Sequence, residues 1–127
     1  MGSIPIGAKS YRYRSVTRHL FKYRWNLLGK VQDHHVIPRH LKNHPVIKMV
    51  NFDIDSSKNL VMMPNKIGIK SFKNIRQDRL IHGSGHLEYN KYVTKHLDCI
   101  ETIMDFETLH AFLKHNCRFN MHKIPWN

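Results

Sequence analysis

Two histidine pairs have a spacing that could support metal-assisted chemistry. His34 and His35 are adjacent, and His82 and His86 are four residues apart. Neighbouring residues of a strand point to opposite faces of the sheet, so one member of the first pair can bind a metal while the other faces a substrate. Residues four apart on a helical turn share a face, so both imidazoles of the second pair can bind one ion.

Hydrolysis of a phosphodiester is a reaction that such groups can catalyse. It requires a deprotonated water in line with the leaving oxygen, and a cation that neutralises the charge building up on the phosphate. An imidazole with an ordinary pKa of ~6.5 can accept a proton from water at neutral pH. Three further neutral imidazoles would bind one divalent ion and leave coordination positions open for a phosphate oxygen and water.

Three stretches that contain these histidines resemble, as a joint pattern, the HNH or ββα-metal (His-Me finger) nucleases, and among them the AHH branch named for an Ala-His-His signature. They are Asp33–Pro38, Phe52–Val61 with Pro64, and His82–Val93, and the resemblance covers roughly residues 31–97. It implies an α+β fold with a ββα-metal core, which is a short β-hairpin plus a metal-binding helix, flanked by additional α-helices. Asp33 stands where the branch name has Ala, and its carboxylate either tunes the site or caps it.

The resemblance also implies a role for each matching residue. It assigns the general base to His35 and the metal ligands to His34, His82 and His86. It assigns to Asn59 a side-chain amide that bridges backbone groups across the loop between the strands and so holds the histidine strand in place.

The expected cofactor is one divalent metal ion. An all-nitrogen site favours Zn or Ni by affinity, whereas Mg or Mn is more abundant and keeps exchangeable water. We expect Mg or Mn in use, with Zn or Ni able to bind, because ligand type alone does not decide.

The elements that must position these residues can be predicted from local pattern. Residues 31–37 alternate as a strand that Pro38 ends, and residues 60–63 form a second strand that Pro64 ends. A helix is expected to start around Ser84, because Gly83 and Gly85 would weaken a helix interior. Apolar and aromatic residues then recur with helical period to Leu97.

The segment 1–30 is basic and is expected to be helical. Apolar residues at helical spacing predict a packed face, made of Val16, Leu20, Tyr23 and Leu27. Cations spaced by four, Arg14, Arg18 and Lys22, predict a second face that either contacts phosphates or is simply solvated. Gly29 is read as the helix stop.

Further phosphate contacts are expected from Arg39, Lys66 and Arg79. The last two belong to a basic segment, 65–79, that either lies along the substrate backbone or is a solvated loop. In segment 98–127 apolar residues recur every three or four positions and predict a core helix, or else a partner-binding face: Ile100, Ile103, Met104, Phe106, Leu109, Phe112 and Leu113. The acids Glu101, Asp105 and Glu107 suggest that this part faces away from nucleic acid.

Composition limits the partners. The chain of 127 residues fits a single domain, 1–127, with its core in 31–97. Twenty-one Lys and Arg against nine Asp and Glu give a net charge of +12, which favours nucleic acid as the partner, DNA first. Cys99 and Cys117 are expected to be free thiols. Without a secretory signal or an apolar stretch of ~18 residues, we expect an intracellular protein and no membrane partner.

These observations favour a metal-dependent endonuclease that hydrolyses DNA, and RNA as a further candidate, with low sequence specificity, because backbone contacts carry no sequence information. Two alternatives stay open. One is a non-catalytic basic nucleic-acid-binding protein whose histidines hold a structural zinc. The other is a toxin-type nuclease domain from a larger secreted protein.

Overall fold

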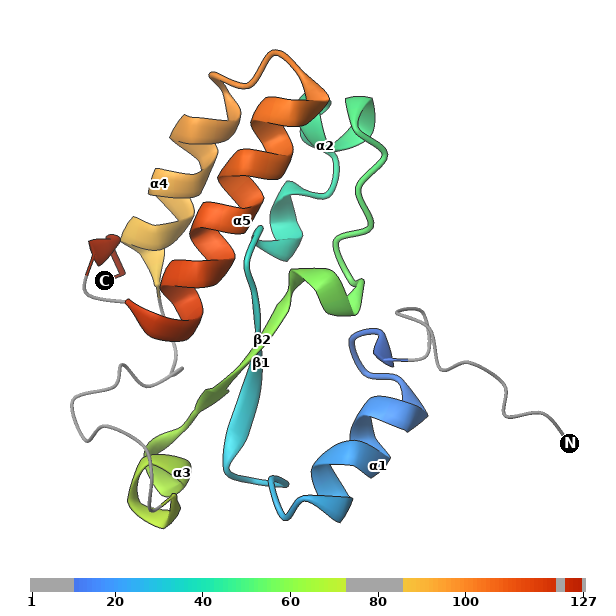
Figure 1. Cartoon of the computed structure of the whole chain (residues 1–127), viewed down its shortest axis with the longest axis vertical. Coiled ribbons are helices and arrows are strands. Elements are labelled where there is room, and N and C mark those ends of the chain that lie inside the picture. The colour runs from blue at the N-terminus through green and yellow to red at the C-terminus, as the bar shows by residue number, and fades with distance from the viewer. Residues whose placement is uncertain (1–10, 73–85, 121–122, 127) are drawn as a thin grey trace, which may run out of the picture.

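The computed structural model describes residues 11–72, 86–120 and 123–126. Within them the chain forms a two-stranded antiparallel sheet with helices on both sides, which confirms the expected α+β class (Figure 1). The elements in chain order are α1 (Val16–Arg24), β1 (Val31–His35), η2 (Arg39–Leu41), α2 (Pro45–Met49), η3 (Ser57–Asn59), β2 (Leu60–Pro64), α3 (Lys66–Ser71), α4 (Leu87–Leu97) and α5 (Ile103–Phe119). Among the described residues, no helix combines the length and the apolar character that crossing a membrane requires.

The register of the hairpin separates the two adjacent histidines. His34 pairs with Val61 and His35 pairs with Leu60, and opposite residues of an antiparallel pair share a face. His34 therefore lies on the face of the hairpin that packs against α4, called here the α4 face. His35 lies on the other face, with Asp33, and this is called the α1 face.

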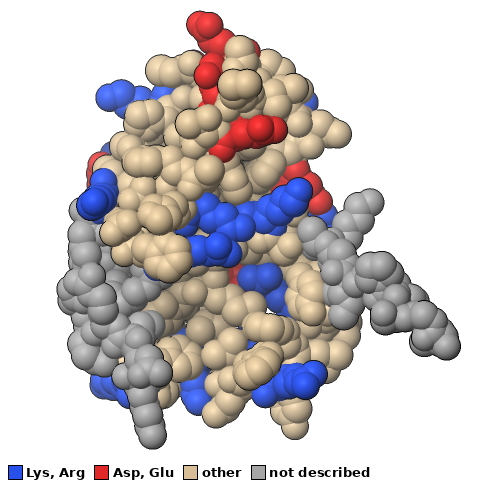
Figure 2. Space-filling view, in the orientation of Figure 1, with Lys and Arg blue, Asp and Glu red and all other residues tan. Residues whose placement is uncertain are grey.

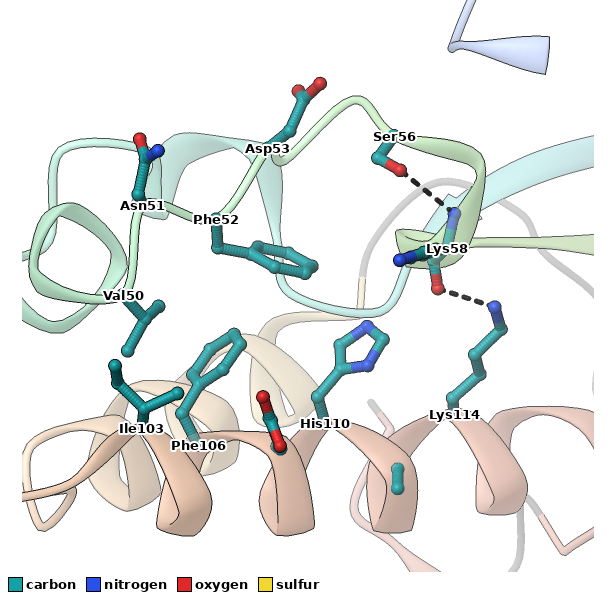
Figure 3. A pocket seen from close by; sticks show the side chains of 12 residues that line it. Val50, Asn51, Phe52, Asp53, Ser56, Lys58, Ile103, Phe106, His110 and Lys114 are labelled. Atoms are coloured by element: carbon teal, nitrogen blue, oxygen red, sulfur yellow. Dashed lines mark hydrogen bonds between the residues drawn. The ribbon is translucent and has the colours of Figure 1, made fainter. Parts of the chain in front are cut away.

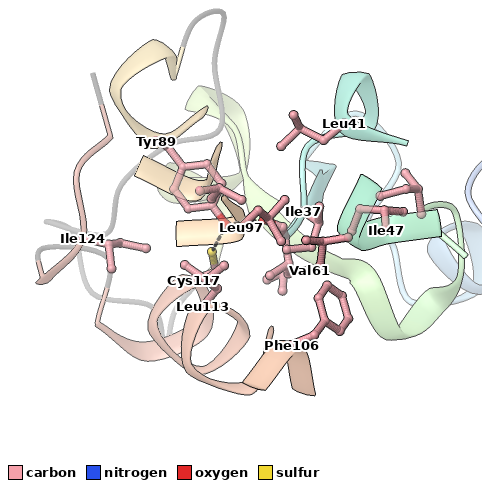
Figure 4. Packing of buried hydrophobic residues seen from close by; sticks show 14 of the residues in the cluster. Ile37, Leu41, Ile47, Val61, Tyr89, Leu97, Phe106, Leu113, Cys117 and Ile124 are labelled. Atoms are coloured by element: carbon pink, nitrogen blue, oxygen red, sulfur yellow. Dashed lines mark hydrogen bonds between the residues drawn. The ribbon is translucent and has the colours of Figure 1, made fainter. Parts of the chain in front are cut away.

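The hydrophobic core lies on the α4 face, where α4 and α5 pack against residues of the hairpin and of the segment between its strands (Figure 4). Tyr89, Val93 and Leu97 recur every four residues along α4 and are fully buried, as the helical period predicts. From α5, Phe106, Leu113 and Cys117 complete the same cluster. The core thus fixes α4 against the strand that carries His34.

Part of the expected apolar face of α5 is solvent-exposed. Met104 is 75% exposed and Phe112 46% exposed. A helix turns by about 100° per residue, so Met104 lies about 200° away from Phe106, and Phe112 about 100° away from Leu113. The sequence contains more apolar residues in this helix than one face can bury. The two thiols are free, as expected, with Cys99 exposed and Cys117 buried.

The prediction for the packed face of α1 is wrong. Val16 is 75%, Leu20 57% and Tyr23 71% exposed, whereas Arg18 is the one buried residue of the helix. The helix has this orientation because Arg18 and Lys22 pair with Asp33 on the sheet. The helix also ends at Arg24, earlier than expected.

Gly29, the expected helix stop, lies instead in the turn before β1. It has a φ of 74°, a conformation that glycine adopts without the penalty paid by other residues.

Charge is distributed unevenly over the surface (Figure 2). Acidic side chains gather toward the end of the molecule where α5 begins, and Lys and Arg gather across the middle of the same view. In this view the acid-rich start of α5 is thus separated from the group of cations.

Candidate functional site

A buried asparagine fixes the end of the histidine strand. Asn59 is fully buried; its Oδ1 accepts from the Ile37 backbone N at 2.8 Å, and its Nδ2 donates to the carbonyls of Ile37 at 3.0 Å and Ile54 at 2.9 Å. The Val36 N also donates to the Asn59 carbonyl at 2.8 Å. One side chain therefore ties the segment directly after His35 to the loop that precedes β2, and this limits the movement of the strand end.

His34 lies in an aromatic environment on the α4 face. Its side chain is fully buried. Its ring centre is 5.3 Å from that of His86, 4.9 Å from that of Tyr89 and 5.0 Å from that of Trp126. The fold thus brings together two of the three expected metal ligands, from β1 and from the residue that precedes α4.

The separation of these two imidazoles fits a shared metal ion. With Zn–N bonds of about 2.0–2.1 Å and tetrahedral geometry, two ligating imidazoles have ring centres about 5 Å apart. Asn90 Oδ1 lies 2.9 Å from His86 Nδ1. An amide oxygen only accepts, so Nδ1 carries the proton and Nε2 presents its lone pair.

The expected third ligand, His82, lies outside the described residues, as does Arg79. Within residues 11–72, 86–120 and 123–126, no group of three His, Cys, Asp or Glu side chains could hold a metal ion. His34 and His86 therefore form the described part of the candidate metal centre.

Trp126 is a site residue that sequence analysis missed. It is only 8% exposed, and its ring centre is 5.0 Å from those of both His34 and His86. Its carbonyl accepts from the Tyr89 backbone N at 3.2 Å. The only sequence signal was an apolar Ile-Pro-Trp near the end of a polar tail, and nothing in its spacing linked it to the histidines.

His35 has a polar environment on the α1 face. Its Nε2 lies 2.9 Å from Asp55 Oδ1, and the two side chains are 11% and 23% exposed. A carboxylate only accepts, so Nε2 donates and Nδ1 carries the lone pair. The Tyr13 ring and the imidazole meet in a T-shaped arrangement, with ring centres 4.6 Å apart, and the Tyr13 backbone N donates to the Asp55 carbonyl at 3.0 Å.

Asp55 is the second residue that sequence analysis missed. Partial burial raises the pKa of its carboxyl, but the hydrogen bond from His35 and the charge of Arg39 outweigh that effect, so the pKa is lowered overall. An ionised carboxylate can orient the imidazole and stabilise the charge that it gains with a proton. The acidic, apolar alternation in 52–57 was visible in the sequence, but its proximity to His35 depends on the fold.

The residues expected to contact phosphate fall into separate places. Arg39 is exposed beside Asp55, with Nε 3.3 Å from Oδ1, and the guanidinium groups of Arg14 and Arg39 lie 4.9 and 5.4 Å from the centre of the Tyr13 ring. Lys66 starts α3 beyond Pro64, which pairs with Val31 at the opposite end of the hairpin from His35. Arg14 and Arg39 therefore flank the candidate base, and Lys66 does not.

Arg18 and Lys22 do not line a surface row with Arg14. Arg14 precedes α1, and both oxygens of Asp33 accept from Arg18, at 2.8 Å each, while Lys22 Nζ lies 2.9 Å from Oδ2. Burial raises the pKa of Asp33, but the hydrogen bonds and charges of the two cations outweigh it and lower the pKa overall. Asp33 thus holds α1 against the histidine strand.

A cavity of about 710 Å³ lies between α5 and the residues that precede β2 (Figure 3). His110 points into it from α5, and its Nε2 lies 3.2 Å from Asn59 Oδ1. Burial, helped by the charge of Lys114, lowers the pKa of His110 to about 4. At neutral pH the ring is therefore uncharged and donates to Asn59.

Comparison with known proteins gives one match. The family model described as a nuclease family of the HNH/ENDO VII superfamily with conserved AHH matches residues 21–116. No curated protein and no solved structure matches the chain.

Proposed function

Because this chain belongs to the AHH nuclease family of the HNH/ENDO VII superfamily, we propose that it is a metal-dependent endonuclease that hydrolyses phosphodiester bonds of DNA, with RNA as a second substrate to test. The observation that carries the proposal is the placement of His34 and His35 on opposite faces of β1. His34 meets His86 on one face, while His35 meets Asp55 on the other. Low sequence specificity follows if contacts are made mainly to the backbone.

The metal would be held by His34 and His86, with His82 as the third ligand. Nucleases of this superfamily generally use a divalent metal. When bound, such an ion supplies positive charge that neutralises the phosphate and the leaving oxygen. Asn90 would keep His86 in the tautomer whose Nε2 faces the ion, and Trp126 would limit the access of water from one side.

His35 would act as the general base through Nδ1. Its Nε2 proton is engaged by Asp55, so the lone pair available to a water is on Nδ1. As Nδ1 takes the proton, the ring becomes cationic, and the Asp55 carboxylate stabilises that charge without itself being protonated. Arg14 and Arg39 would position the phosphate, because they lie around Tyr13 at the same end of β1.

The test is a cleavage assay on plasmid DNA and single-stranded RNA, with Mg, Mn, Zn, Ni or chelator. Wild type and His40→Ala, a variant of an exposed histidine to which no role is assigned, should cleave with metal and stop with chelator. His35→Ala should lose cleavage while it still binds DNA. Cleavage by His35→Ala at the wild-type rate would refute the assigned base.

The structural-zinc alternative is favoured by one observation, the complete burial of His34 among aromatic rings. It predicts that zinc raises the unfolding temperature and that no metal supports cleavage. The same assay, together with thermal unfolding with and without zinc, separates the two functions.

A further inference from the structure

A groove crosses β2 between α1 and the C-terminal end of α5. It encloses about 450 Å³, and two phenylalanines, Phe21 and Phe119, lie along it together with Leu60, Met62 and Arg118. Phe119 is 66% and Phe21 37% exposed, so part of each side chain is accessible to a ligand. Among the described residues that line this groove there is no Asp or Glu.

Cations border the groove on the side of α5. Lys114 Nζ donates to the Lys58 carbonyl and so joins α5 to η3 (Figure 3). Arg118 follows Lys114 one turn later on α5. Figure 2 shows Lys and Arg gathered over this middle part of the molecule. Burial lowers the pKa of Lys114, and the nearby charges of Arg118, Arg18 and Lys58 lower it further, so positive charge is crowded here.

Nearby acids compensate only part of this charge. Asp33 pairs with Arg18 beneath the groove. Asp53 and Glu107 line the neighbouring cavity together with Lys58 and Lys114, and Asp53 itself pairs with Arg12. Arg118 is exposed at the rim of the groove itself. A polyanion bound along this rim would therefore reduce the repulsion between the cations.

We propose that this groove binds unpaired nucleotides of the substrate, with phosphates along Lys58, Lys114 and Arg118 and with bases stacked on Phe119 and Phe21. A basic groove bordered by accessible aromatic rings is the arrangement that binds single strands, because every base has a face that can stack. A duplex keeps its bases stacked on one another and cannot use the two rings. The inference rests on the proposed function and specifies its substrate.

The groove is close to the candidate base in the fold. Leu60 and Met62 both line the groove; Leu60 is the register partner of His35, and Met62 is the partner of Asp33. Partners across an antiparallel pair are about 4.5–5.5 Å apart. A strand held in the groove therefore runs beside the chain segment that carries His35.

The test measures binding of the full chain to labelled strands of about 12 nucleotides by fluorescence anisotropy, with chelator present to prevent cleavage. The probes are an oligothymidine, an abasic strand of the same length and a duplex. The variants are Phe119→Ala, Phe119→Tyr and Arg118→Gln. Phe112→Ala, an exposed phenylalanine of the same helix outside the groove, and Lys95→Gln, an exposed cation of α4, serve as controls.

We expect Phe119→Ala to weaken oligothymidine binding at least about fivefold and to leave abasic binding unchanged, while Phe119→Tyr stays near wild type. Arg118→Gln should weaken binding of both strands. Wild type should prefer the oligothymidine to the duplex, and the controls should match wild type. Circular dichroism of each variant checks that the fold is intact.

Equal binding of oligothymidine by wild type and Phe119→Ala would overturn the stacking, and so would an equal loss on the abasic strand. Equal affinity for polyglutamate would show that the patch serves an acidic protein instead. In any of these cases, cleavage that still requires metal and His35 would leave the proposed function standing. Cleavage that does not require His35 would instead count against the proposed function.

Discussion

The two faces of the hairpin treat neighbouring histidines in opposite ways. On the α4 face, His34 is fully buried among aromatic rings, and the imidazole of His86 lies among them with its ring centre 5.3 Å away. On the α1 face, His35 is partly exposed and bonded to an ionised carboxylate with arginines nearby. A single step along a strand therefore separates a nitrogen suited to hold a cation from one suited to move a proton.

In the proposed function, the supporting residues therefore decide the role of each histidine. Neutral imidazole is a good metal ligand where an amide such as Asn90 sets the tautomer of its partner His86. The same group is a better base where a carboxylate stabilises its protonated form. The following variants test whether the two faces can be disturbed independently.

The largest expected effect comes from substituting the two adjacent histidines one at a time. His35→Ala should lower the cleavage rate by about 10²- to 10⁴-fold and keep metal affinity, because it removes the proton acceptor only. His34→Ala should lose both cleavage and metal binding. Calorimetric titration with Ni or Zn beside the cleavage assay measures the two properties, and loss of metal affinity in His35→Ala would contradict the separation.

Asp33→Ala, which introduces the residue of the family signature, should lower the free energy of unfolding by about 3 kcal/mol, because it leaves the buried Arg18 without its carboxylate. The folded-state pKa of Asp33 is lowered, so its contribution is present above the unfolded pKa and is lost as the pH falls through the folded value. Urea unfolding measures the loss.

Two comparisons control the Asp33 experiment. The double variant Asp33→Ala with Arg18→Met should recover most of the stability, because the buried guanidinium is then removed together with its carboxylate. Asp98→Ala removes an exposed partner of His44 and should change stability little. A single Asp33→Ala variant as stable as wild type would show that this ion pair does not hold α1 to the sheet.

His110 should make the α4 side of the molecule sensitive to acid. Its folded-state pKa of about 4 lies below the ordinary 6.5, so the unfolded chain binds the proton more readily, and stability present above pH 6.5 falls as the pH drops toward 4. Between pH 7.5 and 5 the loss should be roughly 2 kcal/mol.

Urea unfolding of wild type and His110→Gln at both pH values measures the contribution of His110 to this loss of stability. The variant lacks the titrating ring and should lose less stability on acidification. His115→Gln, at an exposed position of the same helix, should keep the wild-type dependence. If His110→Gln and wild type show the same change, the buried ring is not the origin.

The smallest expected effect is the change in metal affinity when Asn90 is substituted. Asn90→Ala removes the acceptor that fixes the tautomer of His86 and should weaken Ni or Zn binding by about tenfold. Lys91→Ala, at the neighbouring exposed position, should bind as wild type. Titration calorimetry compares them, and an unchanged affinity in Asn90→Ala would exclude Asn90 as a support of the site.

Much of the architecture around the histidines could be predicted from local pattern. The alternation before Pro38 and the apolar run before Pro64 predicted both strands, and the period of Tyr89, Val93 and Leu97 predicted the buried face of α4. These succeeded because a strand or a single helical face depends on near neighbours in the chain. The joint histidine pattern also identified the nuclease family.

The orientation of α1 could not be predicted in this way. Val16, Leu20 and Tyr23 have the spacing of a core face, yet the fold buries Arg18, because Asp33 on the sheet offers both carboxylate oxygens. The spacing of apolar residues along one helix contains no information about a charged partner on another element, here the Asp33 carboxylate on the sheet.

Local pattern and composition were enough to predict the strands of the hairpin, the helix α4, the four histidines worth testing and the positive charge that suits nucleic acid. The contacts of Asp55 with His35, of Trp126 with His34 and His86, and of Asp33 with α1 became visible only in the folded chain. The reason is physical: these contacts join residues from 11 to 92 positions apart, and chain separation of that kind leaves no local periodicity to read.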